Sequence, residues 1–138
     1  MKKFLVPFLT FVLFLTACGT PGLYVLDDYI PELIDITTQY PYTEKITVTD
    51  CSTGDVREYT DGEMHDNIRM HFEGIQCTRD KVKENAVYTP LYEVTFYATD
   101  RTTAVTVLSD SAYLIGEYRY DAITSGVDLV YLANLFAE

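Results

Sequence analysis

The chain has 138 residues, is 48% hydrophobic and carries a formal net charge of −11 from 21 acidic and ten basic residues. This length suits one domain, because two domains would each be too small to bury a good core. Such an acidic surface repels a phosphate backbone, so we expect no nucleic-acid partner.

The first 17 residues have the pattern of an export signal. Lys2 and Lys3 form a positive start, and the apolar stretch over 4–17 is shorter than the ~20 residues that a helix needs to span a membrane. We therefore expect 1–17 to be a signal peptide that is removed by cleavage. The alternatives are an uncleaved short anchor or a buried helix. Without the two lysines, the mature chain has a formal charge of about −13.

The sequence Leu15-Thr16-Ala17-Cys18-Gly19 follows this stretch directly. It resembles the lipobox of bacterial lipoproteins. The resemblance implies cleavage before Cys18, a diacylglyceryl thioether on its sulfur and further acylation, with palmitate as a typical chain. Two or three acyl chains hold a protein firmly on a membrane. The expected location is the extracytoplasmic face of the cell membrane, in the Gram-positive host that the signal favours, or the outer membrane in a Gram-negative host.

The segment 18–44 is predicted to be a lipidated tether that leads into the domain. It starts with the turn-forming residues 19–22, and mixes apolar with acidic residues farther on. The folded domain is expected to span 45–138.

The domain is predicted to start with a β-hairpin and an amphipathic helix. Alternating β-branched residues, a turn and a return strand indicate a hairpin over 45–59. Thr60 and Glu63 have the spacing of a capping box, and apolar residues then recur at helical spacing. The helix is expected over 61–73, with Gly74 ending it.

The second half of the domain is predicted to be a three-strand meander after a charged loop at 78–85. The strands are expected at 91–98, 104–108 and 112–120, because each is rich in β-branched or aromatic residues and short turns separate them. Gly116 interrupts the third strand and indicates a bulge or a close contact.

A short C-terminal helix is expected over 126–136, where leucines fall on one face. The predicted fold is therefore α+β. It has an antiparallel sheet of about five strands, a hairpin followed by the meander, with both helices packed on one face.

Cys51 and Cys77 are a candidate disulfide. If Cys18 is lipidated, its sulfur cannot pair, and the other two cysteines are an even pair in an oxidising compartment. The competing interpretation is two separate buried thiols. A zinc site is disfavoured because the chain has no Cys-x-x-Cys and no close His partner.

The residues of chemical interest form no pattern that specifies a reaction. His65 and His71 are six residues apart, which places them on different faces of a helix, and each is expected to face solvent. The acidic clusters at 27–28 and 61–66 do not have the spacing of a calcium loop, and we expect capping and solvation from them. We therefore predict no catalytic residue, no bound metal and no cofactor.

Two hypotheses for function follow. The first is a lipid-anchored, non-enzymatic binding or accessory protein of the cell envelope, which contacts an envelope partner through an exposed sheet face with tyrosines as anchors; the chain has twelve tyrosines and no tryptophan. The second is a small envelope hydrolase or metal-binding protein, suggested by the acidic clusters and the two histidines.

Overall fold

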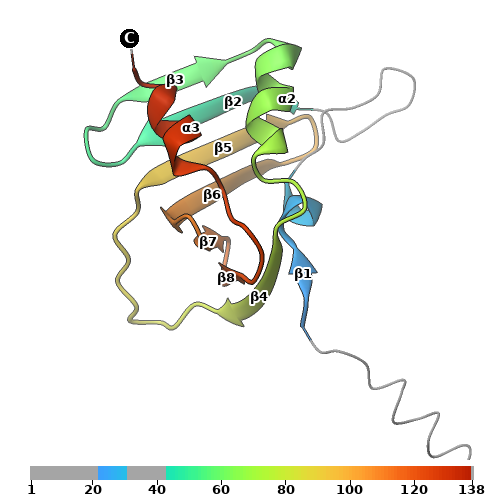
Figure 1. Cartoon of the computed structure of the whole chain (residues 1–138), viewed down its shortest axis with the longest axis vertical. Helices are drawn as coiled ribbons and strands as arrows, with labels where there is room; N and C mark the ends of the chain where they lie inside the picture. The colour runs from blue at the N-terminus through green and yellow to red at the C-terminus, as the bar shows by residue number, and fades with distance from the viewer. Residues whose placement is uncertain (1–21, 31–42, 138) are drawn as a thin grey trace, which may run out of the picture.

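The structure is a computed structural model, and it describes residues 22–30 and 43–137 (Figure 1). The predicted signal peptide, Cys18 and part of the predicted tether lie outside these residues. Within the described part, none of the helices has the length and apolar character that crossing a membrane would require.

The described residues form one antiparallel sheet of eight strands with two α-helices and a short 3-10 helix. The elements in chain order are β1 (Tyr24–Val25), η1 (Leu26–Tyr29), β2 (Thr43–Asp50), β3 (Val56–Tyr59), α2 (Gly62–Met70), β4 (Gln76–Lys81), β5 (Tyr92–Ala98), β6 (Thr102–Ser109), β7 (Ala112–Ile115), β8 (Tyr118–Ala122) and α3 (Leu129–Asn134). The strand order across the sheet is β1-β4-β8-β7-β6-β5-β2-β3.

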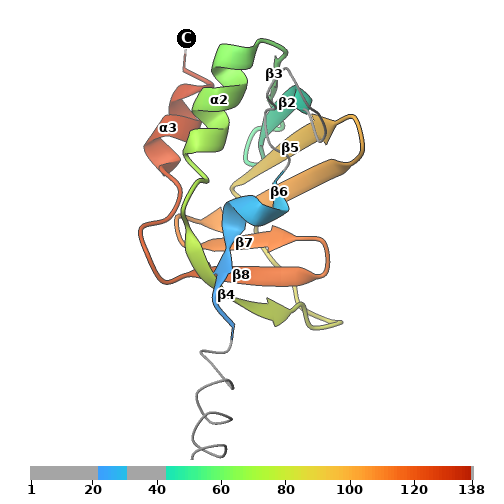
Figure 2. The same cartoon turned by 90° about the vertical axis from the view of Figure 1, so that its right-hand side faces the viewer.

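Both α-helices lie on the same face of the sheet, as predicted (Figure 2). The core lies between them and the sheet, because alternate residues of each strand point to this face. It is built from buried apolar side chains of all the layers, including Ile46, Val48, Ile68, Phe72, Val94, Phe96, Val107, Tyr113 and Leu132.

Helix α2 carries the chain from one side of the sheet to the other. It starts after β3, at one edge, and ends before β4, which pairs with β1 and β8 near the opposite edge (Figure 1). The segment after β4 then returns to β5, which pairs with β2 and β6. The predicted hairpin and the predicted meander therefore belong to one sheet.

The α+β class is confirmed, but the sheet has eight strands and not about five. One additional strand is β4, which occupies part of the segment predicted as a charged loop. Its sequence Gln-Cys-Thr-Arg-Asp-Lys contains one buried apolar residue, Cys77, so the usual hydrophobic alternation is missing. Pairing with β8 on one side and β1 on the other holds it in the sheet.

The predicted strand over 112–120 is in fact a hairpin of β7 and β8. Gly116 has a φ of 58°, which an L side chain rarely adopts, and it forms the two-residue turn with Glu117. Gly116 therefore marks a reversal of the chain rather than a bulge, and the meander gains a strand.

Strand β1 and helix η1 lie inside the segment predicted as a tether. Tyr24 and Val25 pair with Cys77 and Gln76, and Leu26 and Ile30 are buried in the core. Residues 22–30 are thus part of the folded sheet and its core, ahead of the expected domain start at 45.

Both helices are shorter than predicted, and aspartates cap them. The Asp61 carboxylate accepts a hydrogen bond from the Met64 N–H at 2.9 Å, so Asp61 rather than Thr60 is the N-cap of α2. The Asp128 carboxylate caps α3 in the same way, which places the start of this helix after the glycine-containing segment 125–127.

Candidate functional site

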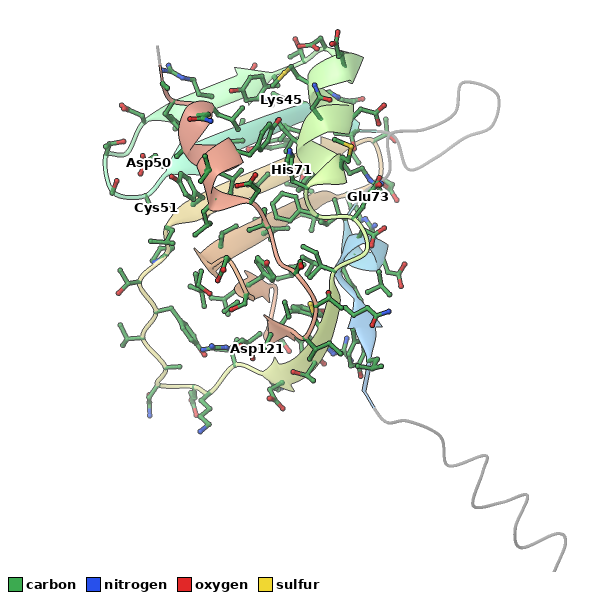
Figure 3. All side chains as sticks on the ribbon, in the orientation of Figure 1. Lys45, Asp50, Cys51, His71, Glu73 and Asp121 are labelled. Atoms are coloured by element: carbon green, nitrogen blue, oxygen red, sulfur yellow. The ribbon has the colours of Figure 1, made fainter. Side chains whose placement is uncertain are left out.

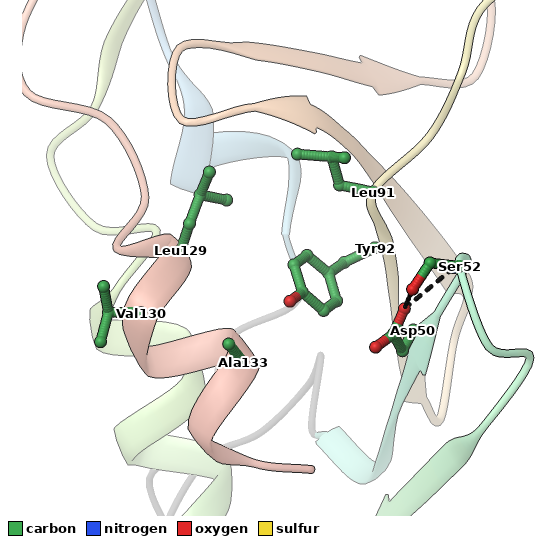
Figure 4. A pocket seen from close by; sticks show the side chains of 7 residues that line it. All are labelled: Asp50, Ser52, Leu91, Tyr92, Leu129, Val130 and Ala133. Carbon is green, nitrogen blue, oxygen red and sulfur yellow. Dashed lines mark hydrogen bonds between the residues drawn. The ribbon is translucent and has the colours of Figure 1, made fainter. Parts of the chain in front are cut away.

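A groove of about 370 Å³ lies between α3 and the neighbouring ends of β2 and β5 (Figure 4). Its lining consists of Asp50, Ser52, Leu91, Tyr92, Leu129, Val130 and Ala133. Figure 4 shows the α3 side chains on one side of the groove and the strand residues on the other. Most of this lining is apolar, and Val130 and Leu91 are 68% and 39% exposed.

The α3 side of the groove is held by a tight crossing of the chain. Gly126 lies so close to the Asp110 carbonyl that a Cβ atom at this position would be 1.6 Å from that oxygen. The Tyr113 hydroxyl donates to the same carbonyl and accepts from the Val127 N–H at 2.8 Å. The Asp128 carboxylate then accepts from the first N–H groups of α3, and so the helix begins at a fixed point.

Tyr92 forms the floor on the strand side. Its ring stacks on that of Phe136, which follows α3, at a centroid separation of 6.2 Å. The guanidinium of Arg57 lies 5.7 Å from the centroid of the Phe136 ring. Burial, with the nearby charge of Asp50 as a second cause, raises the pKa of the Tyr92 hydroxyl. Tyr92 therefore presents a neutral, braced aromatic surface to the groove.

Asp50 supplies a fixed negative charge at the rim. Its carboxylate accepts hydrogen bonds from the Ser52 hydroxyl at 2.6 Å and from the Ser52 N–H at 2.9 Å. These bonds favour the ionised form, and they hold the pKa of the Asp50 carboxyl below its ordinary value of 3.8. The turn that carries both residues is closed by hydrogen bonds between the backbones of Asp50 and Gly54 and of Asp50 and Asp55.

The groove therefore combines an apolar surface with one carboxylate. Among the seven described residues of the lining, Asp50 is the one ionisable group that carries a charge at neutral pH. The Ser52 hydroxyl is already engaged with this carboxylate. The arrangement suits recognition of an apolar group that has a cation beside it.

The structure does not bring Cys51 and Cys77 together, and both are free thiols. Cys51 follows β2, whereas Cys77 lies on β4, and four strands separate these two in the sheet. Cys77 pairs with Ala122 of β8, which is the neighbour of Asp121 in sequence. Figure 3 shows Cys51 beside Asp50 and well separated from Asp121. A disulfide needs Cα atoms within about 7 Å, so the predicted bridge is absent from this fold.

Neither thiol has the environment of a nucleophile. Burial raises the pKa of Cys77 to about 11, with the charge of Asp121 as a second cause. Burial, followed by the charges of Glu93 and Asp50, also raises the pKa of Cys51. Both sulfurs are protonated at neutral pH, and Cys77 is fully buried in the core.

The two histidines lie in different environments, and the expectation of solvent exposure is wrong for His65. This residue is buried, and its Nε2 lies 2.7 Å from the Tyr59 carbonyl, which joins α2 to β3. The His71 ring stacks on Tyr131 of α3 at a centroid separation of 3.7 Å. Each histidine thus connects helix α2 to a neighbouring element.

One residue of each acidic cluster accepts a backbone hydrogen bond. Asp61 caps α2. The Asp27 carboxylate accepts a hydrogen bond from the Gly74 N–H at 3.1 Å, which joins η1 to the segment between α2 and β4. Within 22–30 and 43–137, no group of three or more His, Cys, Asp or Glu side chains is arranged to hold a metal ion.

Comparison with protein-family models, with curated proteins and with solved structures finds no significant match to this chain.

Sequence patterns did not indicate the groove. Its lining comes from segments around residues 50, 91 and 130, which only the folded sheet brings together. The Asp-x-Ser sequence at 50–52 was one local signal, since Asp accepts hydrogen bonds from the residue two positions on in many turns.

Proposed function

We propose that this chain is a lipid-anchored protein of the bacterial cell envelope and that its domain is a non-enzymatic module that binds a partner protein through the groove beside α3. Two features support the two parts of this proposal. The lipobox-like sequence ending at Cys18 supports the anchor. The groove, with apolar walls and one fixed carboxylate, supports the binding function.

The observation that carries the proposal is the position of the groove relative to the N-terminal strand. The groove lies at the α3 end of the sheet, beside β2 and β5, whereas β1 lies at the opposite edge beside β4 (Figure 1). A protein anchored through Cys18 would therefore present the groove away from the attachment point.

The chemistry of the groove indicates the kind of partner. The apolar walls favour aliphatic or aromatic side chains, and the Asp50 carboxylate favours a lysine or arginine next to them. The formal charge of about −13 on the mature chain attracts a basic partner from a distance. We infer a segment of an envelope protein in which a basic residue stands beside apolar ones.

Peptide selection on the intact mature protein tests this binding function. Selection from a random library should enrich sequences with Lys or Arg beside an aliphatic or aromatic residue. Asp50→Asn should weaken their binding at least ten-fold, because a charge-assisted contact is worth roughly 1.5–3 kcal/mol. Ala133→Glu should abolish it by filling the groove and placing a second charge on its apolar wall.

The matched control is Asn134→Glu, which adds the same carboxylate to the next position of α3, outside the lining. This variant should bind the selected peptides as the wild type does. The proposed binding function fails if the peptides bind all three variants equally well, or if selection enriches no common chemistry.

The anchor is tested separately with Cys18→Ala. This variant should lose incorporation of labelled fatty acid and cleavage of the first 17 residues, because the thioether requires the Cys18 sulfur. The domain of this variant should remain folded, with the urea-denaturation midpoint of the wild type. Fatty-acid labelling that persists in Cys18→Ala would contradict the proposed anchor.

A further inference from the structure

The sheet edge next to β1 presents cations among tyrosine rings. We call this the β4–β8 surface and define it by Tyr24, Tyr29, Arg79, Lys81 and Tyr118. Arg79 is paired with Tyr120 and Lys81 with Tyr118 across β4 and β8, so these side chains point to the same face of the sheet. Tyr24 and Tyr29, from β1 and η1, lie over this face and beside Arg79.

Arg79 lies between two aromatic rings. Its guanidinium carbon is 4.0 Å from the ring centroid of Tyr24 and 4.2 Å from that of Tyr118, and its Nη2 donates to the Tyr24 hydroxyl at 3.3 Å. No carboxylate among the described residues forms an ion pair with it. The rings hold the guanidinium in place and leave its positive charge without a counter-charge.

The β4–β8 surface is surrounded by nearly equal numbers of basic and acidic residues. The segments 79–84 and 117–121 contain four basic residues, which are Arg79, Lys81, Lys83 and Arg119, and four acidic ones, which are Asp80, Glu84, Glu117 and Asp121. These two segments are therefore neutral, and η1 adds Asp27 and Asp28 next to Tyr29. The cations on the β4–β8 surface are Arg79 and Lys81, and the Lys81 Nζ lies 3.7 Å from the Glu117 carboxylate. These two cations are the groups that can attract an anionic surface.

The chain length keeps this surface close to the proposed lipid anchor. Tyr24, which pairs with Cys77 of β4, is six residues after Cys18. Even a fully extended chain spans only about 20 Å over that distance. Leu23, which is 53% exposed, adds an apolar side chain at the same end of β1.

We propose that the β4–β8 surface lies against the anionic phospholipid headgroups of the membrane that holds the lipidated Cys18. Lysine and arginine bind anionic headgroups, and tyrosine favours the boundary between lipid and water. The short link to Cys18 keeps this edge of the sheet next to the membrane, and the α3 groove, beside β2 and β5, lies toward the opposite edge. This inference rests on the proposed function, because it requires the anchor.

Amide hydrogen exchange of the full lipidated protein on vesicles tests the orientation. The vesicles contain either neutral phospholipid alone or neutral and anionic phospholipid in a three-to-one ratio, with the protein at low surface density. Strand β1 pairs only with Gln76 and Cys77, so the outer edge of β4 beyond them has no strand partner among the described residues. Amides in 78–83 should exchange at least five-fold more slowly on the anionic vesicles, and amides of α3 should not change.

Charge reversal identifies the cause of this protection. Lys81→Glu should reduce the protection at least five-fold, because each basic residue near an anionic surface contributes about a five-fold factor to binding. Arg101→Glu makes the same change of charge in the turn between β5 and β6, outside the β4–β8 surface, and should leave the protection intact.

The outcomes separate this inference from the proposed function. A protein that carries acyl chains by mass spectrometry but shows equal exchange on both kinds of vesicle overturns the orientation and leaves the anchor standing. Equal loss of protection in Lys81→Glu and Arg101→Glu also overturns it, because only net charge would then matter. A mature protein without acyl chains overturns both.

Discussion

The hydroxyl of Tyr113 accepts a hydrogen bond from the backbone N–H of Val127 at 2.8 Å. Tyr113 is on β7, in the centre of the sheet, and Val127 is in the segment that leads into α3. Both residues are buried, and the same hydroxyl donates to the Asp110 carbonyl. One side chain thus connects the sheet to the helix that forms a wall of the groove.

Tyr113→Phe should reduce the free energy of unfolding by about 1–3 kcal/mol, because the buried Val127 N–H then has no acceptor in that position. Urea denaturation of the mature protein measures this change. Tyr97→Phe is the control, since Tyr97 is half-buried on the other face of the sheet and its ring contact with Lys45 does not need the hydroxyl. An equal loss in both variants would show that the Tyr113 hydrogen bonds add nothing specific.

Gly126→Ala should destabilise the protein by more than about 2 kcal/mol and disturb the α3 side of the groove. The added Cβ would be 1.6 Å from the Asp110 carbonyl oxygen and 2.5 Å from the Tyr113 hydroxyl, so the backbone has to move. Gly62→Ala is the control, because a Cβ there meets no atom within 4 Å and alanine favours a helix. Thermal unfolding compares the two variants. A Gly126→Ala protein as stable as Gly62→Ala would contradict the close approach of Gly126 to the Asp110 carbonyl.

Asp61→Ala should cost about 1 kcal/mol of stability, because it removes the acceptor of the Met64 N–H at the first turn of α2. Asp66→Ala removes an exposed carboxylate from the same helix without removing a cap, and it should be neutral or slightly stabilising. Denaturation in urea measures both. If Thr60 were the cap, as the capping-box spacing suggested, Thr60→Ala would show the larger loss.

The parts of the fold that the sequence predicted are those with a local signal. The hairpin of β2 and β3 has alternating β-branched residues, and α2 has apolar residues at helical spacing. Strand β4 lacks such a signal, because the side chains of Arg79 and Lys81 face tyrosine rings and solvent rather than an apolar core. Strand β1 has two residues, and only its pairing with β4 makes it a strand.

The cysteine pair and the groove depend on the order of the strands, which local patterns do not determine. The sequence separation of Cys51 and Cys77 allowed a bridge, but α2 carries Cys77 to the far side of the sheet. In the same way, Asp50 and Ala133 line one groove only because α3 returns to the ends of β2 and β5. Long-range pairing of this kind has to be observed in the structure.

Stability should fall as the pH rises from about 9 to about 11. The ordinary pKa of a cysteine is 9.0, and burial raises the pKa of Cys77 to about 11, so the folded state holds a proton that the unfolded state has lost. The stability that the protonated Cys77 thiol contributes is fully present below pH 9 and is lost as the pH rises through 11. Tyr113, whose pKa burial raises to about 12 from 10.0, extends the fall to higher pH.

Cys77→Ala tests the assignment of this pH dependence. Each such group contributes at most about 1.4 kcal/mol per pH unit to the slope of the free energy of unfolding. Cys77→Ala should remove the share of Cys77 between pH 9 and 11, whereas Cys51 and Tyr113 keep theirs. Cys51→Ala should change the slope less, because Cys51 is only half-buried. Chemical denaturation at several pH values gives the slopes, and an unchanged slope in Cys77→Ala would refute the assignment.

The two thiols should also differ in reactivity. Both are free, so the intact mass of the mature protein should be the same with and without reductant, and two alkylations besides any change at Cys18 should appear after denaturation. In the folded protein at pH 8, Cys51 should react slowly with a small alkylating reagent, because burial and nearby carboxylates raise its pKa. Cys77 should react only at the rate of unfolding, because it is buried in the core between β1 and β8. A mass that rises by two hydrogens on reduction would instead demonstrate the bridge and require a different position for β4.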